Sequence, residues 1–184
     1  MNLFLALVSL FAGDTVLVLE PSATEVHWTL ETVLHTVHGT FQLKSGIVHF
    51  DPATGKASGR LVVNAASGES GNESRDARMH KSILESARFP DIVFTPDHED
   101  GAIPAQGSTT IQVHGTFQLR GVDHELTIPV QIAVDPGQVS ASARFVVPYI
   151  RWGLKNPSTF VLRVSDHVDI ELHSVGHISN GGSR

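Results

Sequence analysis

The seven residues VHGTFQL occur at Val37–Leu43 and again at Val113–Leu119. In both copies Val, Gly, Phe and Leu alternate with the polar residues His, Thr and Gln. This period of two is typical of a β-strand with one dry and one wet face, and neither copy has the spacing of an amphipathic helix. Each copy puts a glycine and a phenylalanine on the enclosed face. The pair therefore favours a sheet that closes into a barrel around apolar side chains.

The rest of the chain predicts further strands, separated by turn residues, and one helix. The helix is predicted over Ser74–Ser86, with Ser74 as N-cap and with Met79 and Ile83 on its apolar face. Pro129 falls inside a predicted strand and indicates an edge position or a bulge, because proline cannot donate to the strand ladder. The other strands are predicted at residues 16–19, 25–30, 46–50, 59–65, 91–95, 109–119, 125–134, 139–148, 160–165 and 168–175. The fold class predicted is mostly β and antiparallel, with one helix inserted near residues 74–86.

Composition narrows the classes of function. The 184 residues carry a net charge of −6, which argues against nucleic-acid binding, because phosphate contacts need clustered Lys and Arg. The sequence contains no cysteine, so disulfides and thiolate chemistry are excluded. It also contains no nucleophile elbow, P-loop, Rossmann fingerprint or HExxH motif, and we therefore predict a protein that is not an enzyme and needs no cofactor.

The first residues indicate export. Residues 1–13, MNLFLALVSLFAG, resemble the hydrophobic region of a signal peptide and are too short to span a bilayer; the alternative is a buried first strand. We predict a signal segment over 1–13, one β-barrel domain over 14–177 and a flexible tail over 178–184. The expected location is the periplasm or the exterior of the cell, with no transmembrane segment in the mature chain.

The inward-facing residues leave two alternatives open, since a small barrel is either packed solid or encloses a ligand cavity. Gly39 and Gly115 matter here, because an inward glycine leaves space that a side chain would otherwise fill; the alternative is a bend at a barrel corner. The candidate lumen residues are Trp28, Val37, Gly39, Phe41, Leu61, Val63, Phe94, Val113, Gly115, Phe117 and Phe145.

Two groups of polar residues are further candidates. Arg75 and Asp76 open the predicted helix, where an anionic head group could bind; the alternative is that Asp76 caps backbone amides while Arg75 pairs with a strand carboxylate. Arg151 and Trp152 in a later loop are other head-group candidates. A metal site is a separate hypothesis: His38 and His114 would meet if the two VHGTFQL strands were neighbours, with His80 as a third zinc ligand.

Four blocks of this sequence resemble the YceI-like family of bacterial lipid-binding, lipocalin-like barrels. They are RDARMHKSILESARFPDIVFTP at 75–96, HGTF at 38–41, HGTFQLRGVDHELTIPVQI at 114–132 and VSDHVDIELHSVG at 164–176. The resemblance implies an eight-stranded antiparallel barrel with a helix near one end. It also implies binding, storage or transport of a polyisoprenoid or related amphiphile in the lumen, usually in the periplasm. A metal-binding module or metal-dependent enzyme remains the alternative, and monomer and homodimer are both compatible with the sequence.

Overall fold

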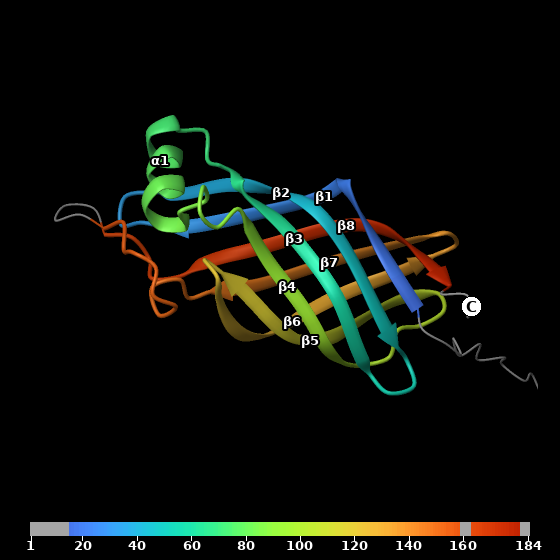
Figure 1. The fold of residues 1–184 in the computed structure, drawn as a ribbon. Coiled ribbons are helices and arrows are strands. Elements are labelled where there is room, and N and C mark those ends of the chain that lie inside the picture. Colours follow the sequence, from blue (N-terminus) through green and yellow to red (C-terminus); the bar gives the residue numbers. More distant parts are fainter. Residues whose placement is uncertain (1–14, 159–162, 181–184) are drawn as a thin grey trace, which may run out of the picture.

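Eight antiparallel strands form one closed barrel in the part of the chain that the computed structural model describes, residues 15–158 and 163–180 (Figure 1). Each strand pairs with the next, and the last pairs with the first, which confirms the predicted mostly-β antiparallel barrel. The predicted signal segment lies outside the described residues. The strands are β1 (Thr15–Glu31), β2 (Thr36–Asp51), β3 (Lys56–Glu69), β4 (Asp91–Asp100), β5 (Gly107–Leu119), β6 (Val122–Asp135), β7 (Gln138–Val147) and β8 (Val168–Asn180).

Several predicted strands are parts of longer ones, because register shifts replace the expected turns. β1 joins two predicted strands across a shift between Leu19 and Val26, and this shift contains Pro21. Leu17 and Leu19 face inward on odd positions before the shift, and Val26 and Trp28 face inward on even positions after it. A strand that gains an odd number of residues at a shift exchanges its two faces in this way.

The ends of other strands also differ from the prediction. β2 includes the first VHGTFQL and the strand predicted at 46–50, and β4 continues to Asp100 through residues predicted as a loop. β8 continues to Asn180, so residues 178–180 of the predicted tail pair with β1, and residues 181–184 lie outside the described part. Of the strand predicted at 160–165, residues 160–162 are outside the described part, and Val164 makes only an isolated bridge to Thr32.

The helix between β3 and β4 confirms the predicted insertion but begins earlier. α1 (Glu73–Arg78) is followed by a π-helical segment, η1 (Met79–Leu84). The N-cap is Asn72 and not Ser74, since the Asn72 Oδ1 accepts a hydrogen bond of 3.0 Å from the Arg75 backbone N–H. Among the described residues, no helix is long and apolar enough to cross a membrane.

Different segments lie at the two ends of the barrel. One end, here called the helix end, carries α1, η1, the β1–β2 turn at 32–35 and residues 148–158, which follow β7 (Figure 1). An ion pair between Glu85 and Arg120 fastens the end of the helical segment to the β5–β6 turn. The opposite end, here called the far end, carries the β2–β3 turn, the β4–β5 loop at 101–106 and the β6–β7 turn.

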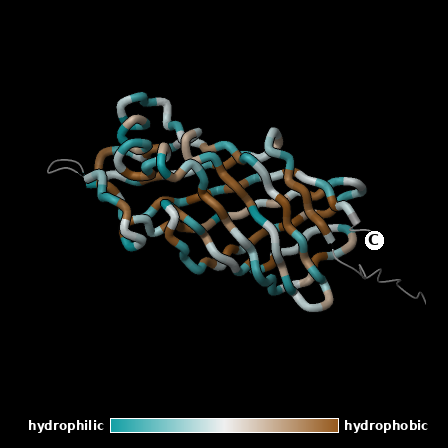
Figure 2. The backbone as a smooth tube through the Cα atoms, in the orientation of Figure 1, coloured by the Kyte–Doolittle hydropathy of each residue, from teal (hydrophilic) through white to brown (hydrophobic). Residues whose placement is uncertain are grey.

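Alternation along the strands builds the interior. Hydrophobic and hydrophilic positions alternate along the barrel wall (Figure 2), as expected for strands with one buried face. The buried side chains form three clusters, which centre on Leu19 and Ile132, on Phe94 and Ile128, and on Leu84 and Tyr149.

The pairing between β6 and β7 is short. β6 pairs with β5 over its whole length, including Pro129 opposite Gln112. Its described pairing with β7 covers only Val130–Asp135. Pro129 therefore marks the point at which β6 becomes an unpaired edge on the side of β7, in agreement with the predicted edge position.

Candidate ligand-binding cavity

The barrel interior contains two adjoining chambers. The deep chamber, of about 190 Å³, lies within the barrel, and the mouth chamber, of about 550 Å³, lies beneath the helical segment at the helix end. Four side chains line both chambers and mark the level at which they meet: Phe41, Ile92, Phe117 and Ile170. The two chambers thus follow one another along the barrel, from the helix end toward the far end.

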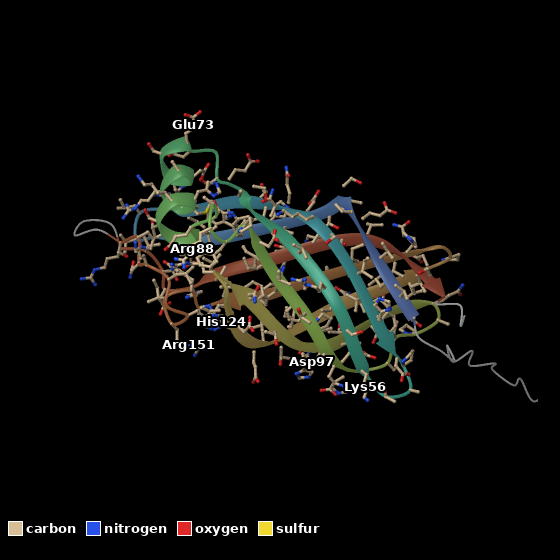
Figure 3. The ribbon with its side chains drawn as sticks, in the orientation of Figure 1. Lys56, Glu73, Arg88, Asp97, His124 and Arg151 are labelled. Carbon is tan, nitrogen blue, oxygen red and sulfur yellow. The ribbon has the colours of Figure 1, made fainter. Side chains whose placement is uncertain are left out.

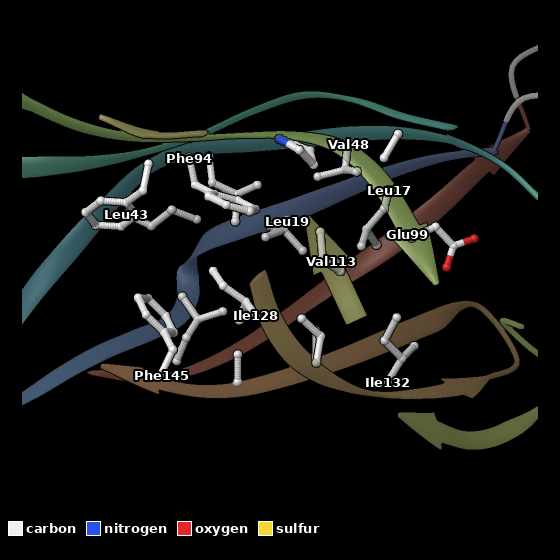
Figure 4. A pocket seen from close by; sticks show the side chains of 18 of the residues that line it. Leu17, Leu19, Leu43, Val48, Phe94, Glu99, Val113, Ile128, Ile132 and Phe145 are labelled. Carbon is white, nitrogen blue, oxygen red and sulfur yellow. The ribbon is translucent and has the colours of Figure 1, made fainter. Parts of the chain in front are cut away.

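The walls of the deep chamber are almost entirely apolar. Inward side chains from all eight strands contribute to it, among them Leu19, Phe94 and Ile128 (Figure 4). Glu99 is the exception: it lies beside Leu17 and Val113, and it is the labelled side chain in Figure 4 that carries oxygen atoms. Such a chamber can receive a hydrocarbon chain without polar contacts along most of its length.

The mouth chamber has apolar walls and a polar rim. Leu84, Leu119 and Tyr149 are among the residues of its walls. Tyr149 is buried and donates a hydrogen bond of 2.7 Å from its hydroxyl to the Ser165 carbonyl, and burial raises its pKa to about 12. The rim consists of Thr32, His35, Asn72, Ser74, Arg75 and Arg78. Charged side chains also surround this end outside the chamber, including Glu73, Arg88 and Arg151 (Figure 3).

Nine of the eleven predicted lumen residues line these chambers. Gly39 and Gly115 do not, and the space that each leaves is filled by protein. A Cβ at Gly39 would lie 2.4 Å from the Trp28 ring, and a Cβ at Gly115 would lie 2.9 Å from the Phe94 ring and 2.4 Å from the Thr95 carbonyl oxygen. The two glycines therefore admit neighbouring aromatic rings and backbone, and the expectation that they leave room for a ligand is wrong.

The predicted head-group residues separate into two pairs. Arg75 lines the rim, but its guanidinium is committed to Ser70, with Nε 2.7 Å from Oγ and a second bond of 3.0 Å to the carbonyl oxygen. Asp76 accepts hydrogen bonds from the backbone and the hydroxyl of Ser70, which help to hold its pKa below the ordinary value. Both residues thus hold the loop before α1, and Arg75 pairs with no strand carboxylate among the described contacts.

The second pair lies outside the mouth chamber. Arg151 is exposed and does not line either chamber. Trp152 packs with its ring centroid 5.6 Å from that of Phe117 and stacks on His124 at 4.1 Å, with the rings nearly parallel. Trp152 therefore lies behind a residue of the chamber wall and supports it.

The geometry contradicts the zinc hypothesis. β2 and β5, which carry His38 and His114, are not neighbours in the barrel. His38 bonds to Thr29, His80 donates from Nε2 to the Gly68 carbonyl at 2.8 Å, and His114 bonds to Asp100. Within residues 15–158 and 163–180, no cluster of three His, Cys, Asp or Glu side chains has the arrangement of a metal site.

Sequence reasoning did not name many residues of the deep chamber, among them Leu19, Ile128 and Glu99. Glu99 is the ionisable one of these. It falls in a Pro- and Asp-rich stretch that predicts a loop, where strand alternation is not applied. Ile92, Phe94 and Pro96 face inward, and a register shift between Pro96 and His98 then turns Glu99 inward in place of His98. The inward position of Glu99 depends on that shift, for which the sequence contains no separate signal.

Comparison with known proteins identifies the family. The family model for the YceI-like domain matches residues 17–175, which is nearly the whole barrel. The chain belongs to the YceI-like family. No curated protein matches this YceI-like sequence.

Solved structures share the YceI-like fold at low sequence identity. Burkholderia cenocepacia BcnA superposes with a TM-score of 0.69 at 17% identity, covering 85% of this chain and 98% of that one. A polyisoprenoid-binding domain from Saccharophagus degradans gives 0.65 at 14% identity, covering 89% and 98%. The Campylobacter jejuni YCEI protein gives 0.56 at 17% identity, covering 74% and 80%.

Proposed function

We propose that this YceI-like barrel binds, and thereby stores or transports, a long-chain amphiphile such as a polyisoprenoid or a related lipid. The hydrocarbon chain occupies the deep chamber, and the polar head group lies at the rim of the mouth chamber. The observation that carries the proposal is the succession of two adjoining chambers: the deep one is apolar except for Glu99, and the mouth chamber carries several polar side chains. The resemblance to a polyisoprenoid-binding domain supports the same class of ligand.

The binding energy in this proposal comes from the apolar walls. Each CH₂ group moved from water into such a chamber contributes about 0.8 kcal/mol, so a chain of moderate length binds tightly without many polar contacts. At the rim, Arg78 and the partly committed Arg75 supply positive charge for an anionic head group. Trp28 also lines the mouth chamber, and its buried indole nitrogen, which has no partner among the described residues, is a further donor.

Binding without chemical conversion is part of the proposal. Among the described residues that line the deep chamber, Glu99 is the single ionisable one, and no second polar group accompanies it as an acid–base partner. A hydrocarbon chain seated there would meet walls suited to sequestration.

The test is a titration of delipidated protein with a fluorescent fatty-acid or isoprenoid probe. Ala143 is buried and lines the deep chamber, so Ala143→Trp should fill the chamber and weaken probe binding at least tenfold. Ser142→Trp adds the same side chain to the opposite face of β7 and is the matched control, with binding expected to remain unchanged. Equal binding by the two folded variants, or no binding by the wild type, would contradict the proposal.

Export and self-association complete the proposal. Export to the periplasm or beyond is supported by the apolar run at 1–13, and the intact mass of protein recovered from the periplasm would show whether that segment is removed.

A homodimer is supported by the β6 edge that lacks described β7 partners and by Val122 and Val146, which are exposed on β6 and β7. Light scattering would give the mass in solution.

A further inference from the structure

Glu99 is a buried carboxyl group in an apolar chamber. Glu99 is only 5% exposed, and its side chain lines the deep chamber near the far end. The Oε2 atom is buried and has no hydrogen-bond partner among the residues that the structure describes. A polar atom left in this state costs folding free energy, and a ligand that supplies the missing hydrogen bond recovers part of that cost.

The charged groups around Glu99 are occupied elsewhere. His98 and His114 both bond to Asp100, at 3.0 and 2.9 Å, and these three side chains are all substantially exposed on the outer surface. Across the strand ladder, Glu99 faces Val113, and its backbone N–H donates to the Gly55 carbonyl at 2.8 Å. No cation is thus committed to the Glu99 carboxyl among the contacts described for its neighbours.

The protonated form of Glu99 fits this chamber. Burial raises the pKa of the Glu99 carboxyl, an effect that the nearby His98 only partly offsets. A neutral carboxylic acid can both donate a hydrogen bond to an oxygen and accept one from a hydroxyl group. A ligand cation would have to leave its own hydration shell inside apolar walls, so a neutral oxygen is the better partner.

We propose that Glu99 is a ligand-recognition site at the deep end of the barrel, which binds a neutral hydroxyl or carbonyl oxygen carried by the buried end of the ligand chain. This inference rests on the proposed amphiphile binding and adds a chemical requirement to it. The chain would carry polar groups at two places, with its head group at the rim and a second oxygen at Glu99.

The spacing sets the length of such a ligand. Ile92 lies where the chambers meet, and Glu99 follows seven residues later on the same strand. At a rise of about 3.3 Å per residue this corresponds to roughly 23 Å along the strand. The second oxygen is therefore expected near the far end of a long chain, and a position close to the head group would not reach Glu99.

The experiment compares docosanoate with 22-hydroxydocosanoate, which differ only by a hydroxyl at the chain end and whose extended chains are longer than the roughly 23 Å along β4. Both are measured by displacement of a fluorescent probe from delipidated wild type, Glu99→Gln and Glu99→Leu, with folding checked by thermal unfolding. We expect the wild type to bind the hydroxy acid at least as tightly as docosanoate. The preference for the hydroxy acid should persist in Glu99→Gln and fall about tenfold in Glu99→Leu, because only leucine leaves the ligand hydroxyl unpaired.

Two results would overturn the inference, and they are distinguishable from a failure of the proposed function. A wild type that binds docosanoate but binds the hydroxy acid tenfold more weakly would exclude recognition at Glu99, whether or not the leucine variant folds. An equal ratio of affinities in wild type and folded Glu99→Leu would do the same. Displacement by neither acid, together with no probe binding, would remove the proposed function and this inference with it.

Discussion

The two copies of VHGTFQL have the same sequence but run in opposite directions through the barrel. In β2 the first copy begins at the helix end, so Val37 lines the mouth chamber and Leu43 lines the deep chamber. In β5 the second copy ends at the helix end, so Val113 lines the deep chamber and Leu119 lines the mouth chamber. The central phenylalanines nevertheless reach the same level, since Phe41 and Phe117 both line both chambers.

The copies also differ in what lies across the ladder. Val37 faces Leu30 on β1, whereas Val113 faces Glu99 on β4. The heptapeptide therefore determines which side chains point inward, and the direction of its strand determines which chamber each one meets. The environment of each position depends on partners far away in the sequence.

The largest effects are expected at the two glycines. A Cβ at Gly39 would lie 2.1 Å from the Glu69 carbonyl oxygen, and a Cβ at Gly115 would lie 2.8 Å from the Pro96 Cα. Because backbone atoms cannot move aside cheaply, Gly39→Ala and Gly115→Ala should each lower the free energy of unfolding by about 3 kcal/mol. Urea denaturation would measure this, with Thr40→Ala and Thr116→Ala on the other strand face as controls. Losses no larger than those of the controls would contradict the close approach.

The next effects concern the shared phenylalanines. Phe41→Leu and Phe117→Leu shorten a side chain where the chambers meet, and each should cost about 1 kcal/mol of stability. Because both residues occupy the same level, the two variants should weaken binding of a long-chain probe to similar extents. A titration in which one variant loses affinity for the probe and the other does not would contradict the equivalence of Phe41 and Phe117.

Only the second copy of VHGTFQL faces a buried acid, Glu99, and the pH dependence of stability tests this difference. The pKa of Glu99 in the folded protein is raised above the ordinary 4.5, so the folded state binds the proton more strongly than the unfolded state does. Wild-type stability should therefore fall as pH rises from about 4.5 through the folded pKa, and Glu99→Gln should lack this loss. Melting temperatures of both proteins between pH 4 and 8 would show curves that diverge with rising pH. Parallel curves would contradict a buried acid.

The smallest effect is expected at the outward histidines. His114 bonds to Asp100 at 2.9 Å and helps to keep its pKa below 3.8, whereas His38 bonds only to Thr29 among the described contacts. His114→Ala should raise the Asp100 pKa toward 3.8, and His38→Ala should leave it unchanged, as followed by NMR titration. Stability from a lowered carboxyl pKa is present above the ordinary value and is lost as pH falls. The His114 variant should therefore lose slightly more stability at neutral pH.

Strand alternation predicted much of the cavity, because it depends only on neighbouring residues. It placed Trp28, Leu61 and Phe145 on the inner face correctly. It also favoured a closed barrel, and the family resemblance added the number of strands and the class of ligand. It could not assign residues to chambers, since strand direction is a property of the whole barrel. It also missed Glu99, whose inward position depends on a register shift after Pro96. The space at Gly39 and Gly115 was misjudged, because the aromatic rings that fill it belong to Trp28 and Phe94 on neighbouring strands.

The central claim is that the two chambers together hold an amphiphile with a long apolar chain. Native mass spectrometry of the protein as purified from cells, followed by solvent extraction of the bound material, tests it most directly. The account predicts a mass above that of the polypeptide and an extracted molecule with a long hydrocarbon or isoprenoid chain. A protein at the mass of the polypeptide alone, which after exposure to total lipid extract still yields no such molecule, would contradict it.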